Sequence, residues 1–393
     1  AFVLTSSVAK PAARELSEEE DFELERQLKL MNKPSVKTIK TEYGEIYDCV
    51  DFYKQPAFDH ARLKNHAFHP EMKPSNIMYI PEKVKNEENG RYDNKTNFES
   101  VTLIGIGCPR GTVPIRRTTK DDLIRQKRFN QVFDSNIHPQ TKSEPGLHYA
   151  GGRVRWKWNT RNLAGGVARF SLYQTPFVNQ LQFSSGLIKV SNGTDFIKAG
   201  WTVNPTLYGD DHCRFFSYLH TRDDHCFNTN CPGFVITNPD FPLDYGFLKV
   251  SKTYVDIVEA RILIFRDPSD GSWWLCIGDK PITIGFWPSD IFTDLAYNAD
   301  DVFWGGEIFT LPYTKSSPMG NGISAHYDDP KLYAYARSCS VVDADKEIIV
   351  PVVGGVHEVV SDIGWDYVRH NYLRFKDWGL IIMFGGPSKI FGK

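Results

Sequence analysis

The sequence Trp304-Gly305-Gly306-Glu307 combines residue types that could carry acid–base chemistry. A glutamate that follows a tryptophan and two glycines at a predicted strand start has two interpretations. In the first, the glycines mark a bulged strand and Glu307 is exposed or paired. In the second, Glu307 lies in an aromatic cleft, where the glycines let a substrate backbone approach closely and partial burial adapts the carboxyl to acid–base catalysis.

A second group of reactive residues consists of two Asp-Asp-His-Cys sequences, at 210–213 and 223–226, followed by Cys231. Imidazole, thiolate and carboxylate together can bind zinc. Cys226 and Cys231 enclose only Phe-Asn-Thr-Asn, which in a secreted β-protein equally suits a short loop closed by a disulfide. We expect neither a metal site nor a cofactor.

Composition excludes several classes of function. The chain has 46 Lys and Arg against 48 Asp and Glu, and therefore lacks the positive charge of a nucleic-acid binder. It has no apolar run of about 18 residues, so we expect no membrane span. The Gly-x-Ser-x-Gly, P-loop, His-Glu-x-x-His and dinucleotide-binding sequences are absent.

Several features of the sequence favour an oxidising compartment. Residues 1–9 end in the small-x-small pattern of a signal-peptide cleavage site and are interpreted as its remnant. Asn94 and Asn192 begin glycosylation sequons. Cys49 and Cys108 both lie in the N-terminal part and could pair, which would staple a region of low apolar content. We expect a secreted protein, extracellular or vacuolar.

The N-terminal part has a mixed pattern of elements. Residues 10–34 form an acidic segment in which a helix is predicted over 17–31, with Ser17 and Glu20 as a capping box. Residues 35–128 are predicted as a small mixed α/β domain, and 129–147, polar and without periodicity, as a linker.

The C-terminal part, residues 148–393, has the pattern of an all-β domain. Short β-type runs recur every ten residues or so, and Arg266-Asp-Pro-Ser-Asp-Gly-Ser predicts a hairpin turn between two of them. Many short strands at this spacing indicate an antiparallel sandwich or barrel. The predicted fold class is therefore mainly β, preceded by a small α/β segment.

Passages spread over most of the chain resemble the plant neprosin family of secreted glutamic endopeptidases that cleave at proline. The passages that resemble the activation peptide of that family are Asp48-Cys-Val-Asp-Phe-Tyr-Lys-Gln-Pro-Ala-Phe-Asp-His and Gly107-Cys-Pro-Arg-Gly-Thr-Val-Pro-Ile-Arg-Arg. Those that resemble its catalytic domain include Ala199-Gly-Trp-Thr-Val-Asn-Pro, Cys226-x-x-x-x-Cys231-Pro-Gly-Phe-Val, Trp304-Gly-Gly-Glu-Ile and Phe384-Gly-Gly-Pro. The resemblance implies an antiparallel β-sandwich in a zymogen-like layout, with the chain's own N-terminal segment as a partner.

Catalysis in this family implies two glutamates that face one another, one activating water as a base and the other donating a proton. The second glutamate corresponds to Glu307. The first belongs to an Ile-Glu-Ala-Gly-Trp motif, which here reads Ile197-Lys198-Ala199-Gly200-Trp201. The residues that the resemblance places in the substrate cleft are Trp201, Trp304, Gly305, Gly306 and, near a cleft glutamine of similar sequences, Gln180.

The replacement of the first glutamate by Lys198 limits how much of the function carries over. Lys198 beside Glu307 would form an ion pair, and the sharing of a proton between two carboxyls would be lost. Loss of one of two acid–base partners typically lowers the rate by orders of magnitude.

Two hypotheses follow. In the first, the protein is a catalytically impaired relative that binds peptides or Pro-rich polypeptides, with Trp201 and Trp304 gripping proline rings. In the second, it is an active acid endopeptidase in which Asp195, Asp210 or Asp211 replaces the missing carboxylate. Asp195 is disfavoured because an odd offset from Lys198 reverses the face of a strand.

Overall fold

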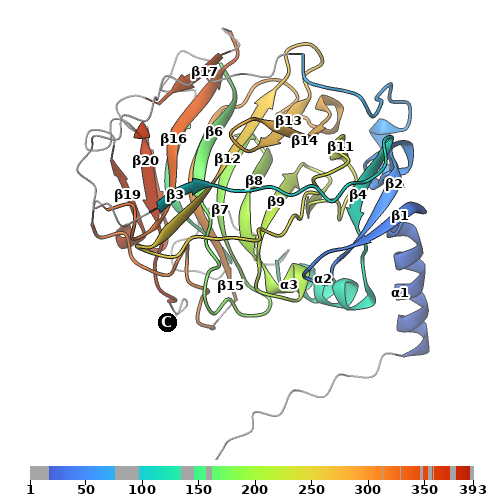
Figure 1. The fold of residues 1–393 in the computed structure, drawn as a ribbon, viewed down its shortest axis with the longest axis horizontal. Helices are drawn as coiled ribbons and strands as arrows, with labels where there is room; N and C mark the ends of the chain where they lie inside the picture. Colours follow the sequence, from blue (N-terminus) through green and yellow to red (C-terminus); the bar gives the residue numbers. More distant parts are fainter. Residues whose placement is uncertain are drawn as a thin grey trace, which may run out of the picture.

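A computed structural model describes residues 17–75, 97–133, 146–155, 162–311, 313–327, 329–345, 348–352, 356, 358–371 and 378–389. The predicted signal remnant at 1–9, Asn94 and residues 134–145 of the predicted linker lie outside these ranges. Figure 1 shows a large body of β-strands with a smaller N-terminal part along one side. The fold is mainly β with antiparallel sheets, which confirms the predicted fold class.

The N-terminal part begins with helix α1, Glu18–Met31, which has the predicted capping box between Ser17 and Glu20. A three-stranded antiparallel sheet follows, in the order β1-β2-β4. Its strands are β1 (Ser35–Lys40), β2 (Ile46–Asp51) and β4 (Thr112–Arg116). Three 3₁₀ turns lie between β2 and β4, at Phe52–Lys54, Pro56–Asp59 and Ala61–Leu63.

Helix α2 (Lys120–Phe133) closes this part of the chain. It extends further than the sequence indicated, because residues 129–133 of the predicted linker belong to it. Phe129 and Phe133 are buried against the β-sandwich, so tertiary packing stabilises a helical turn that the polar sequence did not predict.

The first sheet of the sandwich has seven strands in the order β10-β9-β8-β7-β15-β5-β18. Its members are β5 (Gly146–Arg155), β7 (Phe183–Asn192), β8 (Asp195–Val203), β9 (Cys213–His220), β10 (His225–Phe227), β15 (Asp301–Thr310) and β18 (Glu358–Ser361). The short helix α3, Pro205–Tyr208, follows β8.

The second sheet has ten strands, eight of them in the order β11-β14-β13-β12-β6-β16-β20-β19, with β17 beside β16 and β3 beside β12. Its members are β3 (Asn97–Ser100), β6 (Leu163–Ser171), β11 (Val235–Ile236), β12 (Asp256–Arg266), β13 (Trp273–Ile277), β14 (Ile282–Trp287), β16 (Ala334–Asp343), β17 (Ile348–Pro351), β19 (Val368–Asn371) and β20 (Ile381–Phe384). The predicted hairpin turn joins β12 to β13, where Arg266 pairs with Trp273.

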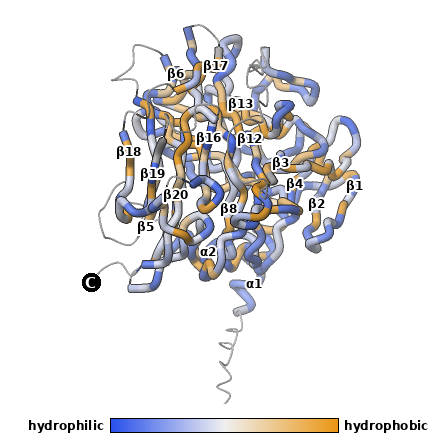
Figure 2. Tube along the Cα trace, turned by 60° about the vertical axis from the view of Figure 1, so that its left-hand side comes forward, coloured by the Kyte–Doolittle hydropathy of each residue, from blue (hydrophilic) through white to orange (hydrophobic). Residues whose placement is uncertain are grey.

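The main core fills the space between the two sheets. Figure 2 shows hydrophobic residues concentrated along the central strands, whereas α1 is mostly hydrophilic. Alternate residues of each strand face this core, as the period of a β-strand requires. No helix in the described ranges is long and apolar enough to cross a membrane.

The N-terminal part is joined to the sandwich by backbone pairing as well as by side chains. Strand β3 runs parallel to β12 and pairs with the first four residues of that strand, 256–259. The hydroxyl of Tyr47 donates to the Asp244 carbonyl at 3.2 Å, and the Gln55 amide donates to the Ile236 carbonyl at 3.2 Å. The N-terminal part is therefore integrated with the second sheet.

Candidate active site

Lys198 and Glu307 meet on the face of the seven-stranded sheet that points away from the second sheet. Lys198 lies on β8 and Glu307 on β15, with β7 between them. The Lys198 Nζ atom donates to Glu307 Oε2 at 2.6 Å, and both side chains are almost fully buried. Position 198, where the resemblance implies the first of the two glutamates, therefore holds the cationic partner of a buried ion pair.

A row of two glycines with a leucine between them crosses the sheet between the two charged groups. Gly305 on β15 pairs with Leu187 on β7, and Leu187 pairs with Gly200 on β8. The two glycines project no side chain from the sheet surface. The long Lys198 side chain can therefore cross from the row that contains Lys189 to the row that contains Glu307.

Aromatic side chains surround the ion pair. The Lys198 ammonium donates to the Tyr149 hydroxyl at 3.0 Å and lies 5.1 to 5.3 Å from the ring centroids of Tyr149, Phe196 and Tyr218. Burial, followed by the charge of Glu307, raises the pKa of Tyr149 well above its usual value. Tyr149 is therefore a neutral hydroxyl at the site.

Burial lowers the pKa of the Lys198 ammonium, and Glu307 opposes this change through its charge and hydrogen bond. The two influences act in opposite directions because low polarity disfavours an ammonium whereas a carboxylate at contact favours it. The short distance between Nζ and Oε2 is typical of a charge-assisted hydrogen bond, so we describe the two groups as an ion pair.

Helix α2 covers one end of this face. Phe129 and Phe133 pack in one cluster with Phe183 of β7 and Phe309 of β15, and the Phe133 ring centroid lies 6.4 Å from that of Tyr218. A pocket remains between α2 and strands β9 and β10, lined by aromatic residues that include Tyr218 and Phe227. The N-terminal segment thus shields the approach to Lys198 from one side.

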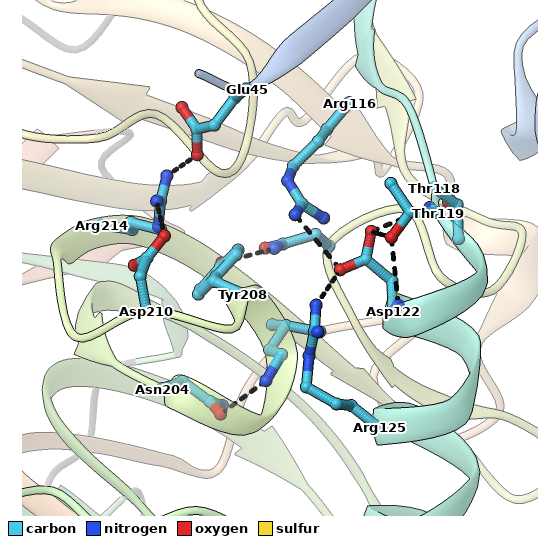
Figure 3. Close-up of polar contacts among 12 residues, drawn as sticks. Glu45, Arg116, Thr118, Thr119, Asp122, Arg125, Asn204, Tyr208, Asp210 and Arg214 are labelled. Atoms are coloured by element: carbon cyan, nitrogen blue, oxygen red, sulfur yellow. Dashed lines mark hydrogen bonds and ion pairs between the residues drawn. The ribbon is translucent and has the colours of Figure 1, made fainter. Parts of the chain in front are cut away.

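Polar contacts hold α2 and its neighbours in place (Figure 3). The Asp122 carboxylate accepts from Thr119 near the start of α2, and it pairs with Arg125 and, at 3.3 Å, with Arg116 of β4. The interface continues at Arg214 of β9, whose guanidinium pairs with Glu45 of the N-terminal segment and with Asp210 at 2.6 Å. Charged groups from both parts of the chain are thus joined beside the covered end of the site.

The structure corrects the predicted placement of the two tryptophans. Trp201 and Trp304 are fully buried in the core between the sheets, on the opposite face from Lys198 and Glu307. Each is three residues from the neighbouring charged residue on the same strand, and an odd offset reverses the face. They support the site strands from beneath and do not line the site.

The two glycines of this motif have different surroundings. A Cβ atom at Gly306 would meet Met319 and Phe384 at 2.6 Å, so this glycine allows close packing in the core. Gly305 is on the site face, where a Cβ atom would meet the Ala150 carbonyl at 2.3 Å. Tight strand packing accounts for both glycines.

Other candidate residues are also placed away from the ion pair. Gln180 is exposed on a turn before β7, and the buried glutamine nearby is Gln182, which binds Thr314 and Ser317. The Asp195 carboxylate accepts from the backbone amides of 293–295. Asp210 pairs with Arg214, and Asp211 is exposed. None of these carboxylates takes the place of the missing glutamate.

The structure places the cysteines and Asn192 in disulfides, in the core or in a hydrogen bond. Cys49 bonds to Cys108 and Cys226 to Cys231, while Cys213, Cys276 and Cys339 are buried free thiols. Of the two interpretations of the Asp-Asp-His-Cys sequences, the structure has the loop disulfide. The described residues contain no group of three potential metal ligands. Asn192, the last residue of β7, donates to the Asn298 carbonyl at 2.6 Å.

The sequence did not single out Tyr149, Lys189, Phe196 or Tyr218. Phe196 has a detectable signal, because it is an even offset from Lys198 and therefore lies on the same face of the strand. Lys189 lies on the paired strand β7. Tyr149 is brought beside Glu307 by the pairing of β5 with β15, which are far apart in the chain. No local pattern reveals that pairing.

Comparisons with known proteins identify the family of the chain. Residues 38–153 match the family model of the neprosin activation peptide, and residues 180–387 match that of neprosin. A solved structure described as the crystal structure of scytalido-glutamic peptidase with a transition state analog inhibitor is similar over 60% of this chain and 98% of that chain, at 8% identity and a TM-score of 0.33. The neprosin match covers more than half of the chain, which therefore belongs to the neprosin family.

Proposed function

We propose that this neprosin-family protein binds polypeptide segments at the Lys198–Glu307 site and does not hydrolyse them by a two-carboxyl mechanism. The observation that carries the proposal is the buried ion pair with its Nζ–Oε2 distance of 2.6 Å. A mechanism with two carboxyls needs one to take a proton from water while the other donates a proton. Here the partner of Glu307 is an ammonium.

The alternative is an active acid endopeptidase that cleaves at proline, and it requires a substitute for the missing carboxyl. Asp195, Asp210 and Asp211 are engaged or directed elsewhere, as described above. A neutral Lys198 could act as a base, but the contact with Glu307 favours the charged form. The arrangement therefore supports binding over hydrolysis.

Aromatic side chains on the site face suit a Pro-rich ligand. Tyr149, Phe196 and Tyr218 surround the ion pair, and the pocket beside α2 is lined by Phe129, Phe133, Tyr218 and Phe227. Flat rings bind proline rings of a polyproline II segment, whose extended form costs little conformational entropy to bind. In this proposal these residues contact the proline rings, a role that the sequence analysis gave to Trp201 and Trp304.

The test is a peptidase assay of the full chain after incubation in acid, with a Pro-containing peptide as substrate. We expect wild-type cleavage to be at least about 100-fold slower than that of Lys198→Glu, which restores two facing carboxyls. Lys280→Glu, on the exposed turn after β13, is a control for the charge change alone. Wild-type cleavage that Glu307→Gln abolishes would overturn the proposal.

We also propose a secreted protein, extracellular or vacuolar, from a plant. Two disulfides support an oxidising compartment. Glycosylation at Asn94 and Asn192 stays a prediction, which mass spectrometry of the protein from its source would check at each asparagine.

A further inference from the structure

Lys189 places a second ammonium group beside the Lys198–Glu307 site. It lies on β7, where it pairs directly with Lys198 of β8 on one side and with Phe303 of β15 on the other. Its side chain is partly exposed in the intact chain. Among the described residues, no carboxylate lies within ion-pair distance of Lys189.

The two lysines share the same aromatic rings. The Lys189 ammonium lies 4.3 Å from the Phe196 ring centroid and 5.7 Å from that of Tyr149. The Lys198 ammonium lies 5.2 and 5.3 Å from the same two centroids. Cation–π contacts hold ammonium groups in place without neutralising them, so two positive charges are close together on one small area.

The carboxylates of this region are already paired with other groups. Glu307 accepts from Lys198, and Asp301 is held by Arg153 at 3.1 Å and Arg155 at 3.2 Å. Glu358 lies 3.8 and 3.4 Å from the same two arginines. Among these seven groups, Lys189 is the one that has no ion-pair partner.

Two other titratable groups lie near these charges, Asp362 and His220. Asp362 accepts from the Tyr149 backbone amide at 2.8 Å and lies 3.7 Å from His148. Burial, with the neighbouring His225, lowers the pKa of His220, which is therefore neutral at pH 7. Burial and then the charge of Lys198 lower the pKa of Lys189 to about 8, so Lys189 is still mostly protonated at pH 7. A partly buried ammonium next to another cation is unfavourable unless an anion binds.

We propose that Lys189 and Lys198 form a subsite for a carboxylate of a bound polypeptide. A carboxylate oxygen can accept from the free ammonium of Lys189 while the aromatic rings contact the ligand beside it. The carboxylate can belong to an acidic side chain or to the end of the polypeptide. This inference rests on the proposed binding of polypeptides and adds a specificity to it.

The test measures binding of three short peptides to the full chain at pH 7 by calorimetry. The peptides are acetyl-Pro-Glu-Pro-amide, acetyl-Pro-Gln-Pro-amide and acetyl-Pro-Gln-Pro with a free terminal carboxylate. We expect at least one carboxylate peptide to bind about tenfold tighter than the neutral peptide. The peptide that gains affinity identifies the source of the carboxylate. Equal affinities of the three peptides would overturn the subsite. If a charged peptide binds and the neutral peptide does not, the result counts against recognition of Pro-rich segments and leaves the carboxylate subsite supported.

Variants make the assignment specific. Lys189→Met is expected to remove the preference for the carboxylate, whereas Lys189→Arg and the control Lys280→Met keep it. Lys189→Met is also expected to raise the melting temperature of the ligand-free protein, because it removes an unpaired charge. A preference that survives in Lys189→Met, or a melting temperature that falls in it, would overturn the subsite and identify Lys189 as a structural residue.

Discussion

Lys198 on β8 reaches Glu307 on β15 across the full width of strand β7. The contact joins residues that are 109 positions apart in the chain and holds the middle of the seven-stranded sheet together. Both groups are out of water, so each depends on the other for charge compensation.

Lys198→Met is expected to lower the free energy of unfolding by about 3 to 5 kcal/mol, because it leaves the Glu307 carboxylate buried without a cation. The double variant Lys198→Met with Glu307→Leu is expected to recover most of that loss, since apolar groups of similar volume suit a buried position. Urea unfolding followed by circular dichroism measures both. A double variant as unstable as the single one would show that packing, and not charge, controls this position.

The Lys189 ammonium gives a stability difference that depends on pH. Because burial and Lys198 lower its pKa from 10.5 to about 8, the folded state binds fewer protons than the unfolded state between these values. Stability therefore rises with pH over that interval and the penalty is complete below pH 8. We expect the advantage of Lys189→Met over wild type to be largest near pH 7 and to shrink by pH 10. An advantage independent of pH would contradict the assignment.

Asp48 of β2 is expected to give a dependence of the same sign at lower pH. Burial alone would raise its pKa, but hydrogen bonds from Arg117 and Thr38 outweigh burial and lower it from 3.8. The carboxylate therefore contributes stability above pH 3.8, and this contribution is lost as the pH falls through the folded-state pKa.

For Asp48→Asn we expect a loss of about 2 kcal/mol at pH 7 and a smaller loss at pH 2. Urea unfolding at the two pH values checks it, with the exposed Asp211→Asn as a control that stays close to wild type at both. An equal loss at pH 2 and pH 7 would show that the shape of the side chain matters and its charge does not.

Phe133 at the end of α2 is expected to control access to the site. Its ring packs against Phe183, Phe309 and Tyr218, so Phe133→Ala removes about 3 kcal/mol of packing that anchors the helix. Amide hydrogen exchange should become faster in α2 and unchanged in β12. Phe177→Ala, at a side chain that is 89% exposed, is the matched control. Unchanged exchange in α2 would mean that the polar contacts of Asp122 alone fix the helix.

The sequence was sufficient to predict the strand pattern. It was also sufficient to predict the contact between Lys198 and Glu307, because both residues lie in motifs of the family and only one of them is replaced. It was also sufficient to disfavour Asp195, because an odd offset reverses the face of a strand. The same rule places Trp201 and Trp304 in the core, since each is three residues from its charged neighbour. The prediction that the tryptophans line an aromatic cleft was therefore wrong, and the odd offset in the sequence was enough to show it.

Other parts of the site depend on contacts between distant segments. Tyr149 reaches Glu307 only because β5 pairs with β15, and the last turn of α2 is helical only because Phe129 and Phe133 have a surface to pack on. Residues 129–147 are polar and lack periodicity, so the sequence predicted that a linker begins at 129. Such features follow from tertiary packing, which a local pattern does not encode.

The Cys49–Cys108 disulfide closes a loop of the N-terminal segment across 59 positions. A peptide bond cut inside that loop leaves two fragments that are still covalently one molecule. The piece that carries α1 and β1 would then stay tied to the piece that carries α2. Release of either fragment needs reduction as well as proteolysis, or a second cut outside the loop, so cleavage by itself is not equivalent to removal.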